Sequence, residues 1–494
     1  MSTPPPIGEG GATGGTVPQT ATRSSRAGLR SGAGAPIGAV GLASALEAQK
    51  DRLLPCVHCG FCLPACPTYN RLGDEADSPR GRLHLMLAVV EGRLDPGSDA
   101  FRTHIDRCLG CRACEPVCPS GVEYGTLLEH ARETSIRAAP AGALTRGLTA
   151  VMGRAPLRRL FFLVGRSLRA SGLAGLAART LPSSGPLASA RLGVAMLASS
   201  RRWRPPAADE RGRAGRKAAG RATASRERAS ADPAADPSDH ARVGERVGLL
   251  TGCVQAGLYG RINRATARVL RANGFHVVEV RGQDCCGALH AHGGALPDAR
   301  ELAKRNIEAF ERAGVERVVV NAAGCGATMK DYGTLLEGDG AWAGRAAALA
   351  RRVRDATEIL AEAGPRQGAP VPCRVAYDHP CHLLHAQRVR EAPLRVLDAV
   401  PGVDVRIVEN ADECCGGAGI YGMTHPDLGG RIGGDKVASV LRTDADVVAT
   451  PNPGCMMQIG AGLRLGGSRM GVAHPVELLD ESYRRAGYYD RSER

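Results

Sequence analysis

The chain repeats one cysteine pattern near its beginning: residues 56–67 read CVHCGFCLPACP and residues 108–119 read CLGCRACEPVCP. In each run, three cysteines are separated by two residues, and a fourth follows after three more and precedes a proline. This spacing is typical of proteins that hold two [4Fe–4S] cubanes, where the fourth cysteine of a run binds the other cluster. Zinc is satisfied by two separated cysteine pairs and does not require such a run. The two runs therefore predict an electron carrier.

The crossed arrangement divides these eight cysteines into two predicted ligand sets. The first cubane set comprises Cys56, Cys59, Cys62 and Cys118. The second cubane set comprises Cys108, Cys111, Cys114 and Cys66. The chain has 17 cysteines in 494 residues, which is unlike a short secreted disulfide scaffold. Thiolate-bound clusters imply a reducing compartment, so we expect a cytoplasmic protein.

A second cysteine pattern is duplicated in the C-terminal half. The gaps between its cysteines are 31 and 38 residues in the first copy and 32 and 39 in the second, which indicates an internal repeat. We predict a metal or cluster site in each copy. CCG site 1 comprises Cys253, Cys285, Cys286 and Cys325, and CCG site 2 comprises Cys381, Cys414, Cys415 and Cys455.

Apolar strands precede these cysteines and alternate with helical segments, which predicts parallel sheets. We expect strands over residues 246–251, 275–280, 317–321, 374–378, 403–408 and 446–450, and helices over residues 260–272 and 299–313. Sites in such sheets form outside the carboxyl ends of the strands, where the cysteines fall. Gly287 and Gly416 would allow strained backbone beside the paired cysteines.

The predicted fold is α+β and multidomain, with a helical two-cluster ferredoxin-like module followed by two α/β parallel-sheet CCG repeats. Its expected parts are a disordered tail (1–40), a ferredoxin-type domain with two [4Fe–4S] clusters (41–140), a basic helical connector (141–200), a flexible linker (201–245), CCG repeat 1 (246–370) and CCG repeat 2 (371–494).

The positive charge is concentrated between the two halves, since residues 141–245 carry +12 of the formal net charge of +14. Residues 141–200 contain eight arginines and no acidic residue, interleaved with apolar residues, which predicts amphipathic helices with a basic face. One interpretation is docking on an anionic membrane surface or an acidic partner. The other is a solvated connector. With 3% aromatic residues and no recognition motif, we do not expect nucleic-acid binding.

The quoted motifs resemble those of the iron–sulfur subunit of glycolate oxidase. The resemblance covers roughly residues 45–485. It is carried by the two cysteine runs and by Gly73-Asp74-Glu75, Pro79-Arg80-Gly81-Arg82, Ser120-Gly121-Val122, Asn321-Ala322-Ala323-Gly324-Cys325-Gly326-Ala327, His385-Ala386-Gln387 and Cys414-Cys415-Gly416-Gly417-Ala418-Gly419.

The resemblance implies an oxidoreductase subunit without catalytic residues of its own. Partner FAD-binding subunits would oxidise glycolate to glyoxylate, and this subunit would relay electrons toward a quinone or other acceptor. Its cofactors would be two [4Fe–4S] clusters and further iron–sulfur, or zinc, in the CCG repeats. The expected location follows from the thiolate-bound clusters and the basic helices: it is the cytoplasm, with a peripheral contact on the inner face of the cell membrane.

Two alternatives stay open at this stage. An equivalent subunit of a lactate or anaerobic glycerol-3-phosphate dehydrogenase would show similar motifs, and a zinc-binding or redox-sensing protein would also need convergent thiols. One departure concerns relatives whose CCG motif ends in a fifth cysteine. Thr328 and Gln458 occupy that position here, which puts a five-thiolate arrangement in doubt. Cys373 lies outside both motifs, and we interpret it as a structural thiol.

Overall fold

The computed structural model describes residues 45–205 and 244–489. Both parts belong to one packing unit that spans Ser44–Arg494. The tail predicted over residues 1–40 lies outside the described residues, as does most of the linker predicted over residues 201–245. Those two expectations therefore stay predictions, as do the other domain boundaries.

The N-terminal module is helical, as predicted. It contains α1 (Lys50–Leu53), α2 (Tyr69–Leu72), α3 (Pro79–Val90), α4 (Asp99–Asp106) and α5 (Tyr124–Ala138), with 3-10 turns at Glu47–Gln49 and Glu75–Asp77. Helix α3 begins where Ser78 accepts a hydrogen bond from the Gly81 amide at 2.9 Å and Pro79 takes the first position, where no amide donor is needed. Phe101, Ile105 and Leu127 are fully buried in the apolar core of this module.

Four helices follow: α6 (Ala143–Gly153), α7 (Ala155–Ala170), α8 (Leu173–Thr180) and α9 (Ala188–Ser199), with a 3-10 turn at Gly185–Leu187. The expected helices are therefore present, although two of their arginines do not belong to an exposed basic face. Arg158 and Arg169 turn inward to Asp284 and Ser200, while many leucines of α7 and α8 face outward. The polar bonds of these arginines to the protein body fix that orientation.

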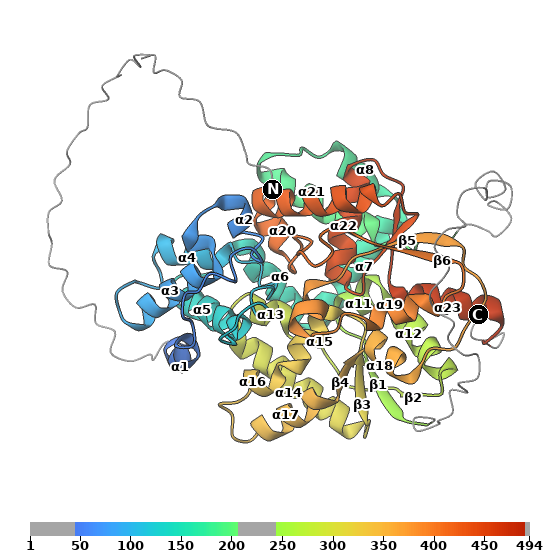
Figure 1. Cartoon of the computed structure of the whole chain (residues 1–494), viewed down its shortest axis with the longest axis horizontal. Helices are drawn as coiled ribbons and strands as arrows, with labels where there is room; N and C mark the ends of the chain where they lie inside the picture. The colour runs from blue at the N-terminus through green and yellow to red at the C-terminus, as the bar shows by residue number, and fades with distance from the viewer. Residues whose placement is uncertain (1–44, 206–243, 490–494) are drawn as a thin grey trace, which may run out of the picture. The chain divides into compact units, whose positions relative to one another are not determined.

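CCG repeat 1 is a doubly wound parallel sheet with strand order β2-β1-β3-β4 (Figure 1). Its strands are β1 (Arg246–Leu250), β2 (His276–Val278), β3 (Arg317–Val320) and β4 (Val353–Asp355). Its helices are α11 (Val254–Leu258), α12 (Gly260–Ala272), α13 (Ala288–His292), α14 (Leu296–Arg312), α15 (Ala323–Lys330), α16 (Tyr332–Leu335), α17 (Ala343–Arg352) and α18 (Ala356–Ala363).

CCG repeat 2 has the same topology, with strand order β6-β5-β7-β8. Its strands are β5 (Cys373–Tyr377), β6 (Val403–Ile407), β7 (Val447–Ala449) and β8 (Gly471–Ala473). Its helices are α19 (Ala392–Asp398), α20 (Tyr421–Thr424), α21 (Pro426–Arg442), α22 (Pro453–Leu465) and α23 (Pro475–Ala486), with a π-helical turn at His382–Ala386. One apolar core contains residues of both sheets, including Val247 and Val375.

The topology fixes where a site can form. The chain leaves β1 toward β2 on one side and leaves β3 toward β4 on the other, so the carboxyl ends of β1 and β3 flank a topological switch point. The same holds for β5 and β7. All six predicted strands are observed: five are shorter than predicted, β5 has the predicted length but begins one residue earlier, and α12 has the predicted bounds.

Candidate iron–sulfur sites

The structure brings each predicted cubane set around its own cavity. One cavity is lined by Cys56, Cys59, Cys62 and Cys118, with Cys114 also at its wall. The other is lined by Cys66, Cys108, Cys111 and Cys114. The fourth cysteine of each run thus faces the cavity of the other run. Four thiols around one cavity are the donor set that a [4Fe–4S] cluster requires, so these residues fit such clusters.

Left-handed backbone curls both cysteine loops in the same way. The residues on either side of the second cysteine have positive φ in both runs: 54° and 87° at His58 and Gly60, and 65° and 61° at Gly110 and Arg112. Such angles are strained for a side chain larger than glycine, at a cost of about 1–2 kcal/mol each. The turn points backbone amides inward, and the Gly110 amide lies 3.4 Å from Cys108 Sγ.

A buried cation adjoins the second cubane set. Arg82 is fully buried, pairs with Asp77 at 3.1 Å and lies 4.0 Å from Cys66 Sγ. Burial would lower the pKa of Arg82, but neighbouring thiolates, the Tyr124 phenol and Asp77 raise it, so the guanidinium stays charged. Arg80 pairs with Glu75 at 2.6 Å. Both arginines therefore make salt bridges at the start of α3.

The cysteines of each CCG site converge from three loops. Cys253 follows β1, Cys285 and Cys286 follow β2, and Cys325 lies in the first turn of α15. Cys253 Sγ lies 3.4 Å from Cys285 Sγ, and in CCG site 2 the corresponding distance from Cys381 to Cys414 is 4.0 Å. Hydrogen bonding to Cys285, together with burial, raises the pKa of Cys253. A metal would have to displace that proton, because thiolates are the ligands.

The glycine of each CCG motif is needed for its backbone angle and for close packing. Gly287 has a φ of 88° and Gly416 a φ of 77°, as the sequence indicated. A β-carbon on Gly416 would lie 2.8 Å from the Gly429 carbonyl oxygen in α21. The same atom on Gly287 would lie 3.2 Å from the Ala299 carbonyl oxygen in α14. These glycines let a helix press directly against the paired cysteines.

CCG site 2 contains a buried ion pair that CCG site 1 lacks at the corresponding positions. Lys436 of α21 lies 2.9 Å from Asp378, three residues before Cys381, and both side chains are buried. Leu250 stands three residues before Cys253, and Asn306 of α14 donates to the Cys285 carbonyl oxygen at 2.9 Å. Lys436 and Asp378 were not predicted from the sequence. An alignment of the two repeats could have identified this pair, because Asp378 and Lys436 differ from Leu250 and Asn306 at the matching positions.

CCG site 2 adjoins the second cubane set. Cys111 and Cys414 belong to one buried apolar cluster, against which Cys381 packs. Burial and the nearby Cys381 thiolate both raise the pKa of Cys111. Tyr421 belongs to the same cluster, and its hydroxyl donates to the Arg107 carbonyl oxygen at 2.7 Å. The two predicted redox sites are therefore in direct contact although 270 residues separate Cys111 from Cys381.

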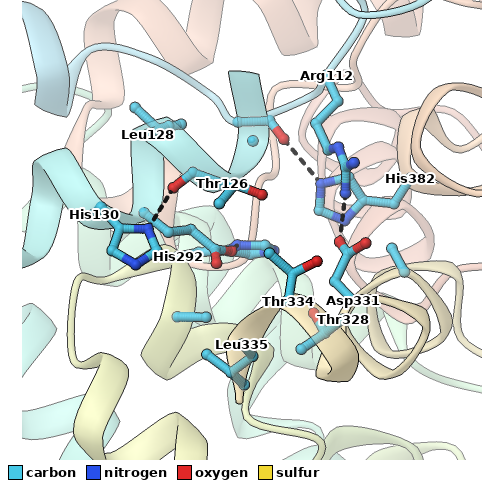
Figure 2. A pocket seen from close by; sticks show the side chains of 15 residues that line it. Arg112, Thr126, Leu128, His130, His292, Thr328, Asp331, Thr334, Leu335 and His382 are labelled. Atoms are coloured by element: carbon cyan, nitrogen blue, oxygen red, sulfur yellow. Dashed lines mark hydrogen bonds and ion pairs between the residues drawn. The ribbon is translucent and has the colours of Figure 1, made fainter. Parts of the chain in front are cut away.

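A polar pocket lies between α5, CCG repeat 1 and the loop that follows β5 (Figure 2). His382 Nε2 lies 3.0 Å from the Gly110 carbonyl oxygen. Arg112 pairs with Asp331 at 2.5 Å, and Figure 2 shows this pair. His292 Nδ1 lies 3.0 Å from Glu129. The pocket thus ties the second cubane loop to both repeats. Its residues Glu129 and His292 carry no motif and were not predicted.

The residues flanking the CCG cysteines have structural partners. His379 packs edge-on against Tyr377, and His385 Nε2 lies 2.9 Å from the Asp412 carbonyl oxygen. Thr328 donates its hydroxyl to the Gly324 carbonyl oxygen at 3.1 Å, so it serves its own helix. Cys373 opens β5 in the buried core, whereas Cys381 follows the other end of that strand. Because the strand spans about 16 Å, Cys373 lies away from CCG site 2.

Comparison with known proteins agrees with this architecture. Residues 52–122 match the family described as 4Fe-4S dicluster domain, and residues 247–330 and 375–460 match the cysteine-rich domain CCG. The "Probable glycolate oxidase iron-sulfur subunit" of Bacillus subtilis is 36% identical over 88% of this chain and 95% of its own length. The "Glycolate oxidase iron-sulfur subunit" of Escherichia coli is 33% identical over 89% and 96%. "Lactate utilization protein A" of an Exiguobacterium species is 29% identical over 49% and 99%.

Proposed function

Because the chain belongs to the family of glycolate oxidase iron–sulfur subunits, we propose that it relays electrons from partner FAD subunits, which oxidise glycolate to glyoxylate, toward a quinone-type acceptor. The dicluster and cysteine-rich domain matches support iron–sulfur electron transfer within an oxidoreductase. Bound clusters would supply one-electron chemistry that a flavin and a quinone can share. Oxidation of the substrate is assigned to the partner subunits.

The contact between Cys111, Cys414 and Cys381 carries this proposal. A relay requires its centres to be close, and here a thiol of the second cubane set lies beside two thiols of CCG site 2. Cys114 lines the cavities of both cubane sets. The three sites therefore form a continuous series through the fold, in the order first cubane set, second cubane set, CCG site 2.

Exposure gives this series a direction. Cys59 is the exposed member of the eight cubane cysteines, and its neighbours Val57 and Phe61 are 69% and 64% exposed. The second cubane set and CCG site 2 are mostly buried. We therefore place the partner flavoprotein at the first cubane set, because an electron must enter where a donor can approach. The quinone-type acceptor would then be served from the CCG repeats.

The experiment is co-purification with the partner subunits, followed by glycolate-dependent reduction of the flavin and of a quinone analogue. In Cys415→Ser, we expect the iron at CCG site 2 to be lost and quinone reduction to stop, while glycolate still reduces the partner's flavin. Cys373→Ala is the matched control, since that thiol is buried but lies outside both sites.

The metal in the CCG sites decides between a relay and a scaffold. Zinc is satisfied by four thiolates and would make these repeats purely structural. About two zinc ions per chain, with iron sufficient only for the cubane sets, would contradict a relay through the CCG repeats. Unchanged quinone reduction in Cys415→Ser would contradict it as well.

Lactate is the second candidate substrate of the complex. It is favoured by the match to lactate utilization protein A, of which this chain covers 99%. Glycolate and lactate differ by one methyl group at the partner's active site, so the same assay run with both substrates separates them. Faster flavin reduction with lactate would replace glycolate in the proposal and leave the relay intact.

A further inference from the structure

The exposed apolar surface of this protein is concentrated on the connector helices. Seventeen large apolar side chains are exposed among the described residues, and ten of them lie between residues 144 and 187. We define the apolar face as the eight on α7 and α8: Leu157, Leu160, Phe161, Leu163, Val164, Leu168, Leu173 and Leu176. A patch of this kind marks a surface that is covered in the working protein.

The apolar face cannot turn inward, because the opposite side of α7 is anchored. Phe162 is buried against Gly257, where a β-carbon would lie 2.4 Å from its ring. Arg158 donates to Asp284 at 2.6 Å, and Arg169 donates to Ser200 Oγ at 2.7 Å. At about 100° per residue, Leu160, Leu163 and Val164 lie on the side of the helix opposite these anchors. The spacing places Leu157, Phe161 and Leu168 beside that side.

Arginines accompany the apolar face. Arg146, Arg154, Arg159, Arg166 and Arg179 are exposed, and residues 141–200 contain no acidic residue. A protein partner with an apolar patch would match the leucines alone, whereas an anionic bilayer matches both features. Acyl chains would cover the leucines, and lipid phosphates would meet the arginines.

We propose that α7 and α8 lie in the interface of an anionic lipid bilayer, with the apolar face in the acyl boundary and the flanking arginines at the phosphates. This arrangement lies along the membrane instead of crossing it. No single helix in the described ranges is long and apolar enough to span a bilayer, and the α7–α8 pair, which passes by length and composition, is bent by 79°.

The test is flotation of the full-length, cluster-containing protein with vesicles of phosphatidylglycerol and phosphatidylcholine, against vesicles of phosphatidylcholine alone. We expect flotation with the anionic vesicles and little with the neutral ones. Leu160→Gln combined with Val164→Gln should weaken binding at least about tenfold, since two side chains leave the acyl boundary. Arg159→Gln combined with Arg179→Gln should also weaken binding to the anionic vesicles. The loss should be largest at low salt, where the attraction between arginines and phosphates is least screened.

The control is Ile407→Gln combined with Leu441→Gln, which removes two exposed apolar side chains from CCG repeat 2 and should leave flotation unchanged. Iron content and reduction of a soluble dye should also stay unchanged in the α7 variant, which separates this inference from the proposed function. Equal flotation of wild type and the α7 variant would overturn the proposal. If the protein self-associates and the same substitutions abolish that association, the apolar face binds a second copy and the proposal is overturned. Equal binding to neutral and anionic vesicles would also overturn it, because the arginines would then play no part.

Discussion

His382 bonds through Nε2 to the carbonyl oxygen of Gly110 at 3.0 Å, which joins the residue after Cys381 to the residue before Cys111. This hydrogen bond spans CCG site 2 and the second cubane loop at the point where the two sites meet. Burial lowers the pKa of His382 to about 3, so the ring is neutral and Nε2 carries the donor proton. A single side chain thus holds two predicted redox sites at a fixed separation.

Replacing His382 with Ala should therefore slow electron passage between these sites. The lost hydrogen bond costs about 1 kcal/mol, which leaves the fold intact but loosens the loop. Stopped-flow spectra after glycolate addition to the complex should show normal reduction of the cubane sets and slower reduction of the acceptor. His276→Ala, at an exposed position in β2, serves as control. If the two variants reduce the acceptor equally fast, the contact plays no part in transfer.

Cys118 tests the crossed partition of the cubane cysteines. It belongs to the second run in sequence but lines the cavity of the first cubane set. Cys118→Ser should thus remove or weaken the cluster held by Cys56, Cys59 and Cys62, with a loss of up to about four irons. Iron analysis, with low-temperature magnetic resonance of the reduced protein, would check this. Loss of the buried cluster with retention of the exposed one would show that each run binds its own four irons.

The parts of this protein that could be predicted were those that depend on spacing between residues close in sequence. Cysteine separations gave the four sets, and short apolar runs gave the six strands whose ends position them. Strands β4 (Val353–Asp355) and β8 (Gly471–Ala473) were missed, because β4 contains a single apolar residue and β8 begins with glycine, so neither shows the apolar run that marks the equally short β2 and β7. Helix α14 starts three residues before its predicted start, because Pro297 is favourable in the first turn.

The unpredicted parts depend on contacts between distant segments. His292 and Glu129 are 163 residues apart, so no spacing rule pairs them. The orientation of α7 could not be derived from its composition, because Arg159 and Arg166 are exposed whereas Arg158 and Arg169 turn toward the protein body. Arg158 and Arg169 instead find acceptors on Asp284, Ser200 and the Leu258 carbonyl oxygen, and these partners are known only from the tertiary structure.

The CCG glycine offers a stability test with an internal control. Gly416→Ala should destabilise the protein by about 1–3 kcal/mol, because alanine is strained at a φ of 77° and its β-carbon would press on α21. Gly430 lies inside α21 with open space around its position, so Gly430→Ala should stabilise the helix by up to about 1 kcal/mol. Thermal unfolding midpoints and iron content would measure both. A Gly416→Ala variant as stable as wild type would contradict the packing argument.

Lys436 should make the centre at CCG site 2 easier to reduce. Hydrogen bonds from Cys414 and Cys455, with the charge of Lys436, lower the pKa of Cys415 against the effect of burial. The pKa of Cys286 is raised instead. The hydrogen bond with Cys285 lowers this pKa, but the hydrogen bond with Cys325 and burial together raise it by more. A nearby cation favours the reduced, more negative state of a redox centre. At the position of Lys436, CCG site 1 has the neutral Asn306, and its own nearby cation is Arg158, which pairs with Asp284.

Lys436→Met should therefore lower the midpoint potential of the centre at CCG site 2 and leave that at CCG site 1 unchanged. The single substitution strands the Asp378 carboxylate, which costs about 3–5 kcal/mol when a buried pair is broken. The double variant Lys436→Met with Asp378→Asn removes both charges and keeps the test available if the single variant does not fold. Potentiometric titration followed by magnetic resonance gives both potentials. An unchanged potential at CCG site 2 in both variants would show that Lys436 serves the stability of α21 and not the redox balance between the two repeats.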